Sequence, residues 1–288
     1  MKYGFVLLGL ALLTGCVPPK AEPRYELGRP YRVRGFWFYP NENYTLDDTG
    51  LASVQASNHA PLTANGEVFD QSIVAVGHAT LQLPAVARLT NAENGRSMLV
   101  RVNDRGAGNP GRLVDVTRRT ATLLGMREGT ATRVRLQVLP DESRAAAEFL
   151  PGRPQLAMTT APRGAVIATA LASPSGVRSE TGRAGSTIGT TAADVDPVAI
   201  GRLPETVTHE PANPRRLWVR LDTFEEYQYA AMQRARMSYL GATIVESFDG
   251  RTHRFTTRVG PFDTVRQADD TETDAFARGI PDAKIVVE

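Results

Sequence analysis

The chain has 288 residues, of which 42% are hydrophobic and 22% charged, values that are ordinary for a folded protein. A formal net charge of +2, without any cluster of Lys and Arg, argues against a nucleic-acid-binding surface. The single cysteine, Cys16, excludes an intramolecular disulfide, and the length allows two domains with connecting segments.

Residues 1–15 have the pattern of a secretory signal peptide. Their apolar run is too short to span a bilayer as a mature helix. The run ends in Leu13-Thr-Gly-Cys16, which is similar to the bacterial lipobox, so we expect Cys16 to be acylated and to anchor the protein in a lipid bilayer. Val17 stands where an aspartate would signal inner-membrane retention, which favours the periplasmic face of the outer membrane. The alternative is an ordinary signal peptide with a chance cysteine.

Residues 16–29 are polar and Pro-rich and predict a short tether. Residues 30–140 contain many short β-rich runs separated by Gly, Asn and Pro, beginning with an edge hairpin. One helical stretch is expected at 117–126. So many short strands in one region favour a closed β-barrel over a layered α/β fold.

Residues 141–213 are rich in Ala, Thr, Ser, Gly and Pro and show no sustained periodicity, which predicts a disordered linker. Residues 214–288 show strand and helix patterns in the order βαββαβ. This order predicts a small α+β domain whose helices cover one face of the sheet.

The polar residues with catalytic potential lie in one segment, 62–106. They are Glu67, His78, Asn103, Asp104 and Arg105. A carboxyl group at the end of an apolar strand is well placed for acid/base chemistry. Structural alternatives stay open: Asp104 could cap a turn or pair with Arg105, His78 could be a satisfied structural histidine, and Glu67 could stabilise a turn. No histidine spacing suggests a metal site, and we expect no cofactor.

Seven motifs occur in the order typical of the rare lipoprotein A family, whose catalytic domain is a six-stranded double-psi β-barrel. The motifs are Gly50-Leu-Ala-Ser53, Leu62-Thr-Ala-Asn-Gly-Glu-Val-Phe-Asp70, Gly77-His-Ala-Thr-Leu81, Leu83-Pro84, Asn94-Gly-Arg-Ser97, Val100-Arg-Val-Asn-Asp-Arg-Gly106 and Gly111-Arg-Leu-Val-Asp-Val116. The resemblance covers roughly residues 30–140.

This resemblance implies an endolytic lytic transglycosylase that cleaves peptidoglycan glycan strands between N-acetylmuramic acid and N-acetylglucosamine and leaves 1,6-anhydro ends. Asp104 matches the family's catalytic aspartate and His78 its essential histidine, while Glu67, Asn103 and Arg105 would support the site. One carboxyl group can suffice, because the substrate's own 6-hydroxyl attacks the anomeric carbon.

The chain departs from the family pattern at two places. Val54-Gln-Ala56 stands where Trp-Tyr-Gly is usual, and Ala107 replaces a proline. Aromatic rings commonly stack on sugars, so these changes alter the expected groove. Two other interpretations therefore stay open: a catalytically weak or inactive peptidoglycan-binding lipoprotein that links the outer membrane to septal glycan, and a loosening protein of the expansin kind.

Residues 214–288 resemble a SPOR domain, mainly through 218–224 and Arg258-Val-Gly-Pro-Phe262. Such domains bind glycan strands stripped of stem peptides, which are enriched at the division septum. The resemblance implies septal enrichment, with proteins of the division complex as further partners. Strand alternation predicts a glycan-binding face, with Val219 and Leu221 turned toward the helices. Its residues are Trp218, Arg220, Arg254 and Arg258. Alternatively, Trp218 is half-buried and the arginines only aid solubility.

Overall fold

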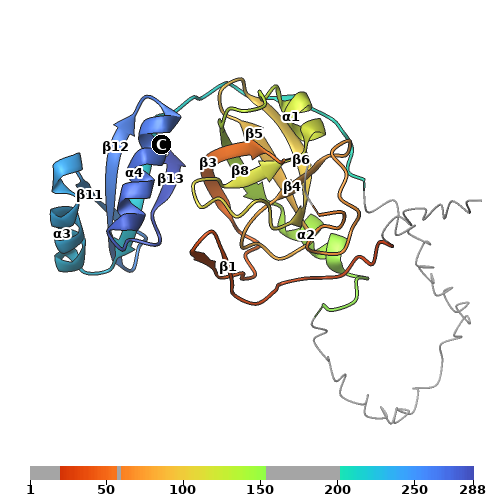
Figure 1. Cartoon of the computed structure of the whole chain (residues 1–288), viewed down its shortest axis with the longest axis horizontal. Coiled ribbons are helices and arrows are strands. Elements are labelled where there is room, and N and C mark those ends of the chain that lie inside the picture. Colours follow the sequence, from red (N-terminus) through yellow and green to blue (C-terminus); the bar gives the residue numbers. More distant parts are fainter. Residues whose placement is uncertain (1–19, 57–59, 154–201) are drawn as a thin grey trace, which may run out of the picture.

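The computed structural model describes residues 20–56, 60–153 and 202–288, in which a β-barrel is followed by a smaller α+β domain (Figure 1). Six strands close the barrel, pairing in the order β4, β7, β3, β8, β5, β6 and back to β4. They are β3 (Asp47–Val54), β4 (Ala75–Gly77), β5 (Ala85–Asn91), β6 (Arg96–Asp104), β7 (Val114–Val116) and β8 (Thr132–Val138). The predicted six-stranded barrel is confirmed.

Alternating side chains fill the barrel. In β8, Val134, Leu136 and Val138 are buried and the polar residues between them are more exposed, as a period of two requires. They join buried aliphatic residues of the other strands, among them Leu89 and Val100, in one core. Each such burial contributes about 1.5–3 kcal/mol. The strand ends that carry the polar residues of interest therefore rest on a well-packed scaffold.

One short helix, α1 (Arg118–Leu124), lies where the sequence predicts it. Thr117 caps its start by accepting a hydrogen bond from the Thr120 N–H, and Gly125 ends it in the left-handed conformation with a φ of 67°. Leu124 inserts into the barrel core. The apolar side chains of α1 therefore belong to the barrel.

The predicted disordered linker, 141–213, differs from the structure at its start. Here α2 (Pro140–Ala147) packs on β5, where the Ser143 hydroxyl donates to the Val86 carbonyl at 3.0 Å. The helix is short and alanine-rich, and its anchoring depends on a hydrogen bond to a distant strand. Composition therefore cannot reveal it.

The far end of the predicted linker also differs from the expectation. Within 202–213, β9 (Thr208–His209) pairs with β6, and Asn213 N–H donates to the Ala92 carbonyl at 2.9 Å. These are main-chain bonds that almost any residue type can make, so the polar composition of the segment gives no sign of them. The remaining part of the predicted linker, 154–201, lies outside the described residues.

The predicted tether is bound to the barrel over the part that the structure describes. We call residues 20–28 the N-terminal strap. The Glu22 N–H donates to the Gly66 carbonyl and the Arg24 N–H to the Asn65 carbonyl, both at 2.9 Å. The strap therefore runs beside the turn that follows Leu62, one of the segments singled out from the sequence.

The C-terminal domain has the predicted βαββαβ order. Its elements are β10 (Leu217–Phe224), α3 (Tyr227–Arg236), β11 (Thr243–Phe248), β12 (His253–Phe262), α4 (Val265–Ala277) and β13 (Lys284–Val287). The strands form an antiparallel sheet in the order β11, β12, β10, β13. Val219 and Leu221 are buried in its core, while Trp218 and Arg220 lie on the other face. None of the helices in the described ranges is both long and apolar enough to cross a bilayer.

The two domains meet where β13 lies against β3 (Figure 1). Leu51 of β3 packs into the core of the C-terminal domain, and the Val287 N–H donates to the Thr49 hydroxyl at 3.1 Å. Gly50, next to Thr49, leaves no room for a side chain, because a Cβ there would lie 2.8 Å from the Cβ of Leu113 in the barrel domain itself. The interface thus combines apolar packing of Leu51 with a hydrogen bond from main chain to side chain.

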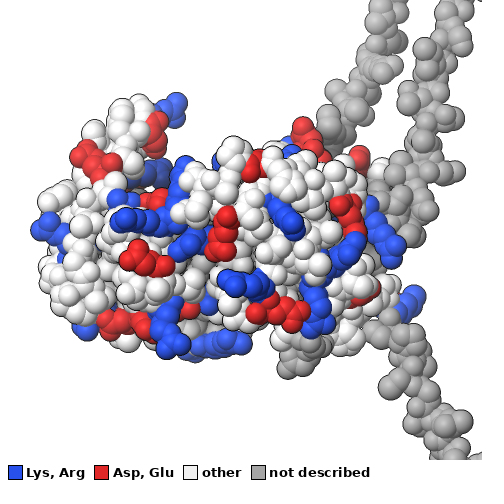
Figure 2. Space-filling view, turned by 90° about the horizontal axis from the view of Figure 1, so that it is seen from above, with Lys and Arg blue, Asp and Glu red and all other residues white. Residues whose placement is uncertain are grey.

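Ion pairs border this interface. Arg112 of the barrel donates to both carboxylate oxygens of Asp269 on α4, at 2.8 and 3.1 Å, and Lys284 of β13 lies 3.3 Å from Asp48. Elsewhere, on the face seen in Figure 2, Lys and Arg side chains are interspersed with Asp and Glu. No patch of one sign dominates that face.

Candidate active site

Asp104 is the last residue of β6, and its side chain is buried, with 4% of the residue exposed. Its Oδ1 accepts a hydrogen bond from the Ala64 N–H at 2.9 Å. Its Oδ2 accepts from the Gln55 side-chain amide at 3.1 Å and from the Gly106 N–H at 3.2 Å. Two segments that are distant in sequence, together with the turn after Asp104 itself, thus place donors on one carboxylate. Such charge-assisted bonds fix both its position and its orientation.

The local alternatives for Asp104 account for only part of this arrangement. The bond from Gly106 is the turn contact expected of an Asp two residues upstream. The Arg105 guanidinium, however, donates to the carbonyls of Leu27, at 2.7 Å, and Leu81. Arg105 therefore ties the N-terminal strap to the loop after Asp104.

His78 follows β4, which runs parallel to β6, and its N–H donates to the Asp104 carbonyl at 2.9 Å. Its Nδ1 accepts from the N–H groups of Thr80 and Leu81, both at 3.2 Å. Burial, aided by the charge of Arg105, lowers the pKa of His78 to about 4. The imidazole is therefore neutral at physiological pH and carries its hydrogen on Nε2, which makes it a hydrogen-bond donor and not a proton source.

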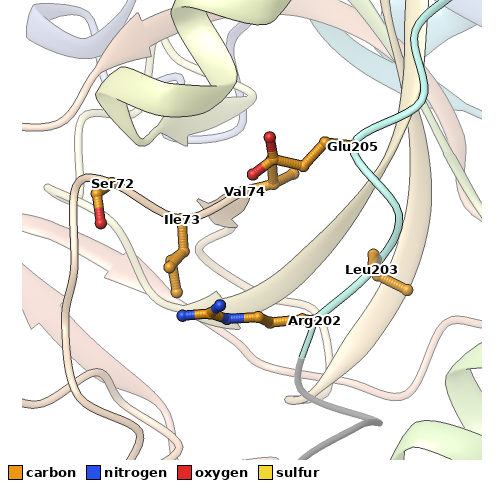
Figure 3. A pocket seen from close by; sticks show the side chains of 6 residues that line it. All are labelled: Ser72, Ile73, Val74, Arg202, Leu203 and Glu205. Atoms are coloured by element: carbon orange, nitrogen blue, oxygen red, sulfur yellow. The ribbon is translucent and has the colours of Figure 1, made fainter.

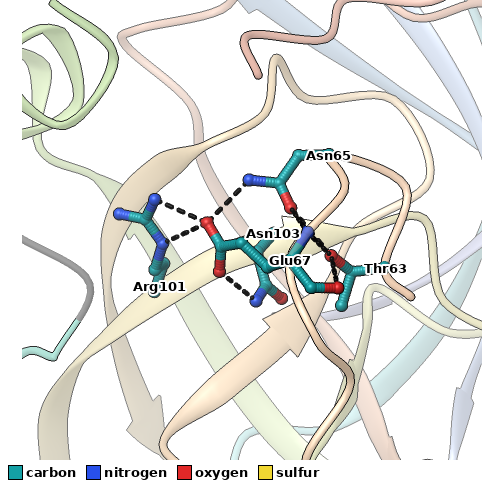
Figure 4. A network of polar contacts seen from close by, with 5 residues as sticks. All are labelled: Thr63, Asn65, Glu67, Arg101 and Asn103. Atoms are coloured by element: carbon teal, nitrogen blue, oxygen red, sulfur yellow. Dashed lines mark hydrogen bonds and ion pairs between the residues drawn. The ribbon is translucent and has the colours of Figure 1, made fainter. Parts of the chain in front are cut away.

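Glu67 is the centre of a polar network (Figure 4). Its Oε1 accepts from Arg101 Nε at 2.9 Å, from Arg101 Nη2 at 2.6 Å and from the Asn65 amide at 2.7 Å. Its Oε2 accepts from the Asn103 amide at 2.8 Å. The turn beginning at Thr63 is thereby fastened to β6, and this turn supplies the N–H that reaches Asp104.

The electrostatics of Glu67 suit this anchoring role. Burial by itself would raise the pKa of Glu67, but the charge and hydrogen bonds of Arg101, together with the Asn103 and Asn65 amides, hold it below its usual range. Glu67 is therefore ionised, and both of its carboxylate oxygens already accept hydrogen bonds within the network. Of the two roles left open by the sequence, site wall or turn stabiliser, the geometry favours the second.

Two further residues shape the site without having been predicted to do so. Gln55 is one, through its bond to Asp104. Asp115 is the other: it accepts from the Ser53 hydroxyl at 2.5 Å and from the Ala107 N–H at 2.6 Å, which holds the loop after Asp104. Asp115 lies inside the Gly111–Val116 motif, so a search for buried carboxyls within the motifs could have found it. Gln55 carries no such signal.

The edge hairpin forms as β1 (Tyr31–Val33) and β2 (Phe36–Phe38). Its turn, however, lies at Arg34-Gly35, inside the stretch 31–39 that the sequence predicts as one strand ending in a turn at Pro40-Asn41. The Tyr31 hydroxyl donates to the carbonyl of Ala79, next to His78, at 2.8 Å. On the outer side of the hairpin, Trp37 and Tyr39 are 56% and 63% exposed and stack with centroids 6.4 Å apart. The hairpin thus exposes aromatic surface, on the face opposite to the one from which Tyr31 contacts Ala79.

A cavity of about 320 Å³ lies between residues 72–74 and residues 202–205 (Figure 3). It is lined by Ser72, Ile73, Val74, Arg202, Leu203 and Glu205. None of the residues that donate to Asp104 lines it. The cavity is therefore separate from the site described above.

The predicted glycan-binding residues of the C-terminal domain are only partly brought together. The Arg258 guanidinium lies 3.8 Å from the centre of the Trp218 ring, and Arg220 pairs with Arg258 in the strand register. Arg254 lies near the start of β12, away from this pair, and forms an ion pair with Asp249 at 3.4 Å. Trp218 is half-buried, as one sequence alternative expected.

Two other sequence-based expectations concern metals and lipid. Within the described ranges, no group of three or more His, Cys, Asp or Glu side chains is arranged to hold a metal ion. Cys16 and the signal-peptide residues lie outside the described residues. Acylation of Cys16 therefore stays a prediction.

Comparison with known proteins identifies the barrel. The family described as lytic transglycolase matches residues 47–136. Curated relatives include endolytic peptidoglycan transglycosylases RlpA. The protein from Rickettsia felis is 32% identical over 123 residues, or 41% of this chain and 54% of the relative. That from Yersinia pestis is 37% identical over 131 residues, covering 43% and 36%, and that from Neisseria meningitidis serogroup B is 37% identical over 133 residues, covering 45% and 56%.

The family match is confined to the barrel, at residues 47–136, and confirms the resemblance to the rare lipoprotein A family. The chain aligns with about half the length of these relatives or less. The SPOR assignment of residues 214–288 stays a prediction.

Proposed function

We propose that the protein is an endolytic peptidoglycan lytic transglycosylase, because residues 47–136 match the lytic transglycolase family. It cleaves between N-acetylmuramic acid and N-acetylglucosamine in glycan strands stripped of stem peptides and leaves 1,6-anhydro ends. The observation that carries the proposal is the buried Asp104 carboxylate at the end of β6, which is oriented by the distant Gln55 and Ala64 and by the neighbouring Gly106. The names of the relatives support the same substrate class.

The proposed chemistry uses one carboxyl group. Asp104 donates a proton to the glycosidic oxygen as the bond from this oxygen to the anomeric carbon breaks. The 6-hydroxyl of the same sugar then bonds to that carbon, and its proton passes to Asp104, which restores the starting state. No water enters, so a second carboxylate to activate it is not required. The Nε2–H of His78 is suited to hydrogen-bond a sugar oxygen, because Nδ1 accepts from the Thr80 and Leu81 N–H groups and the ring hydrogen is therefore on Nε2.

The substrate groove of this protein differs from that of the family at Val54 to Ala56. We place part of the missing aromatic surface on the hairpin, where Trp37 and Tyr39 expose stacked rings. Side chains of this kind combine apolar faces with a polar edge, which suits sugars.

Product analysis tests the activity. The full-length protein is incubated with peptide-free glycan strands, and new anhydro ends are quantified by mass spectrometry. Asp104→Asn keeps the size of the side chain but removes its acid/base capacity, so we expect the rate to fall by about a hundredfold or more. Asp141→Asn, at an exposed position on α2, serves as the matched control and should retain full activity.

Binding of the strands by the wild-type protein without any new anhydro ends would favour a non-catalytic peptidoglycan-binding lipoprotein. Softening of isolated sacculi without new chain ends would instead favour the expansin-like interpretation.

The proposal extends to location. The C-terminal sheet face around Trp218, Arg220 and Arg258 binds denuded glycan at the division septum, and acylated Cys16 anchors the chain in the outer membrane. The cation–π contact between Arg258 and Trp218 supports the first part, because it presents a flat ring and a cation on one surface. The lipobox pattern supports the second.

A further inference from the structure

Gln55 lies immediately after β3 and has only 5% of its surface exposed. Its N–H donates to the Val116 carbonyl at 2.8 Å, and its own carbonyl accepts from the Gln71 amide at 3.2 Å. The main chain of Gln55 is therefore held on both sides. Its side chain leads from this fixed point to Asp104.

The bond from Gln55 to Asp104 differs in kind from the other two. Ala64 and Gly106 donate main-chain N–H groups, whose number does not depend on residue type. Gln55 donates through a side-chain amide, at 3.1 Å from Oδ2. An amide NH₂ group only donates and does not titrate, so it presents the same partner to the carboxyl group at every pH.

We propose that Gln55 is a positioning residue for the reaction of Asp104. Its amide fixes the plane of the Asp104 carboxyl group and keeps Oδ2 in the role of hydrogen-bond acceptor, so that the proton transfers start from one defined geometry. This inference rests on the proposed function for its kinetic effect but not for its structural effect. Gln55 belongs to Val54-Gln-Ala56, where this chain departs from the family pattern, so the inference assigns a function to one of the changed residues.

The test uses Gln55→Met, which keeps the length of the side chain and removes the donor. We expect kcat to fall about tenfold, as for the loss of one hydrogen bond to a charged group, with little change in KM. Gln82→Met is the matched control, since Gln82 is also a buried glutamine, with 0% exposed, and its side chain bonds to Asn43 and not to Asp104. Any loss common to both variants reflects packing.

A second variant separates positioning from packing. In Gln55→Glu the new carboxyl group can donate to Asp104 only while it is protonated, and it repels Asp104 once it is ionised. The activity of Gln55→Glu relative to Gln55→Met should therefore rise as the pH is lowered from about 8 toward about 5. A merely structural role predicts a constant ratio.

A readout without turnover keeps the inference independent of the proposed function. In ¹H–¹⁵N spectra of full-length protein, the amide signals of Ala64 and Gly106 report on the carboxylate to which they donate. They should shift in Gln55→Met and stay in place in Gln82→Met. Equal kcat losses in the two variants together with unmoved amides would overturn the inference. An inactive wild-type protein whose amides shift as expected would overturn only the proposed function.

Discussion

Two carboxylates of the site, the buried Asp104 and the partly buried Glu67, have different surroundings. Glu67 is engaged by the Arg101 guanidinium and two side-chain amides. Asp104 accepts two main-chain N–H groups and one amide. The first arrangement is that of an anchor, because a buried ion pair is costly to break. The second holds a reactive group at a fixed orientation.

Replacing Glu67 should affect stability before chemistry. Glu67→Gln removes the negative charge that faces the buried Arg101 guanidinium at 2.6 Å, so we expect the free energy of unfolding to fall by about 3–5 kcal/mol at neutral pH. The control Asp47→Asn removes an exposed ion pair with Arg135 and should cost about 1 kcal/mol or less. Urea denaturation of the three proteins measures both losses, and similar losses for the two variants would contradict the anchoring role.

The same comparison has a defined pH dependence. The pKa of Glu67 is lower in the folded protein than in the unfolded chain, so its ionised form stabilises the fold. That contribution is complete above the usual carboxyl pKa of about 4.3 and is lost as the pH falls through the folded value. The difference between wild type and Glu67→Gln should therefore shrink in acid.

The sequence indicated some of these residues and not others. Asp104 and His78 stand in motifs, and their neighbourhood follows from the parallel pairing of β4 with β6. The role of Gln55 could not be predicted, because it depends on how close the end of β3 lies to the end of β6. These strands are not paired with each other, so only closure of the barrel sets this distance. The alternatives for Glu67 could not be separated either, since they differ by contacts with Arg101, 34 residues away.

At the scale of elements, α4 rests against the barrel through a buried acid. Glu272 is buried beside Gly111, and among the described residues its Oε1 has no hydrogen-bond partner. Burial, together with the charge of Asp269, raises the pKa of Glu272 to about 8, although Arg112 and the main chain of Ile285 oppose the shift. Glu272 is therefore protonated over most of the physiological range.

Contact between α4 and the barrel should depend on pH. Between about 4.5 and 8, the docked state keeps the Glu272 proton while an exposed Glu272 loses it. Docking is thus strongest below this window and weakens by up to about 1.4 kcal/mol per pH unit across it. Small-angle scattering at both ends of the window should show expansion at the higher pH.

Glu272→Gln should abolish this expansion, whereas Glu142→Gln, at an exposed site on α2, should not. An undiminished pH response in Glu272→Gln would exclude Glu272 as its cause.

Elements were predictable where side chains decide the structure. The alternation in β8 and β10, and the cap and glycine of α1, could all be recognised from residue types. The strap and β9 could not, because both attach through main-chain hydrogen bonds. The docking of β13 on β3 also escaped prediction, because it joins segments far apart in the chain, as in the bond from Val287 to Thr49 across 238 residues.

At the scale of the whole molecule, the lipobox pattern ending in Cys16 predicts attachment to a membrane. If Cys16 carries lipid, Cys16→Ser should move the protein from the membrane fraction to the soluble periplasmic fraction and abolish labelling by fatty acid. Val17→Asp should keep the label but shift the protein to the inner membrane. Thr14→Ser is the conservative control. Full membrane retention of the Cys16→Ser protein would refute the lipobox assignment.

The strap gives such an anchor a mechanical meaning. Any pull on the chain ahead of residue 20 is transmitted to the main-chain bonds of Glu22 and Arg24, which end on Gly66 and Asn65. These residues belong to the same turn as Ala64, whose N–H holds the Asp104 carboxylate. In the proposed enzyme, with Cys16 anchored in a membrane and glycan bound, force between membrane and wall would reach this turn. Envelope tension would then change the rate of the proposed reaction, so that a stretched barrel cuts glycan at a different rate from a slack one.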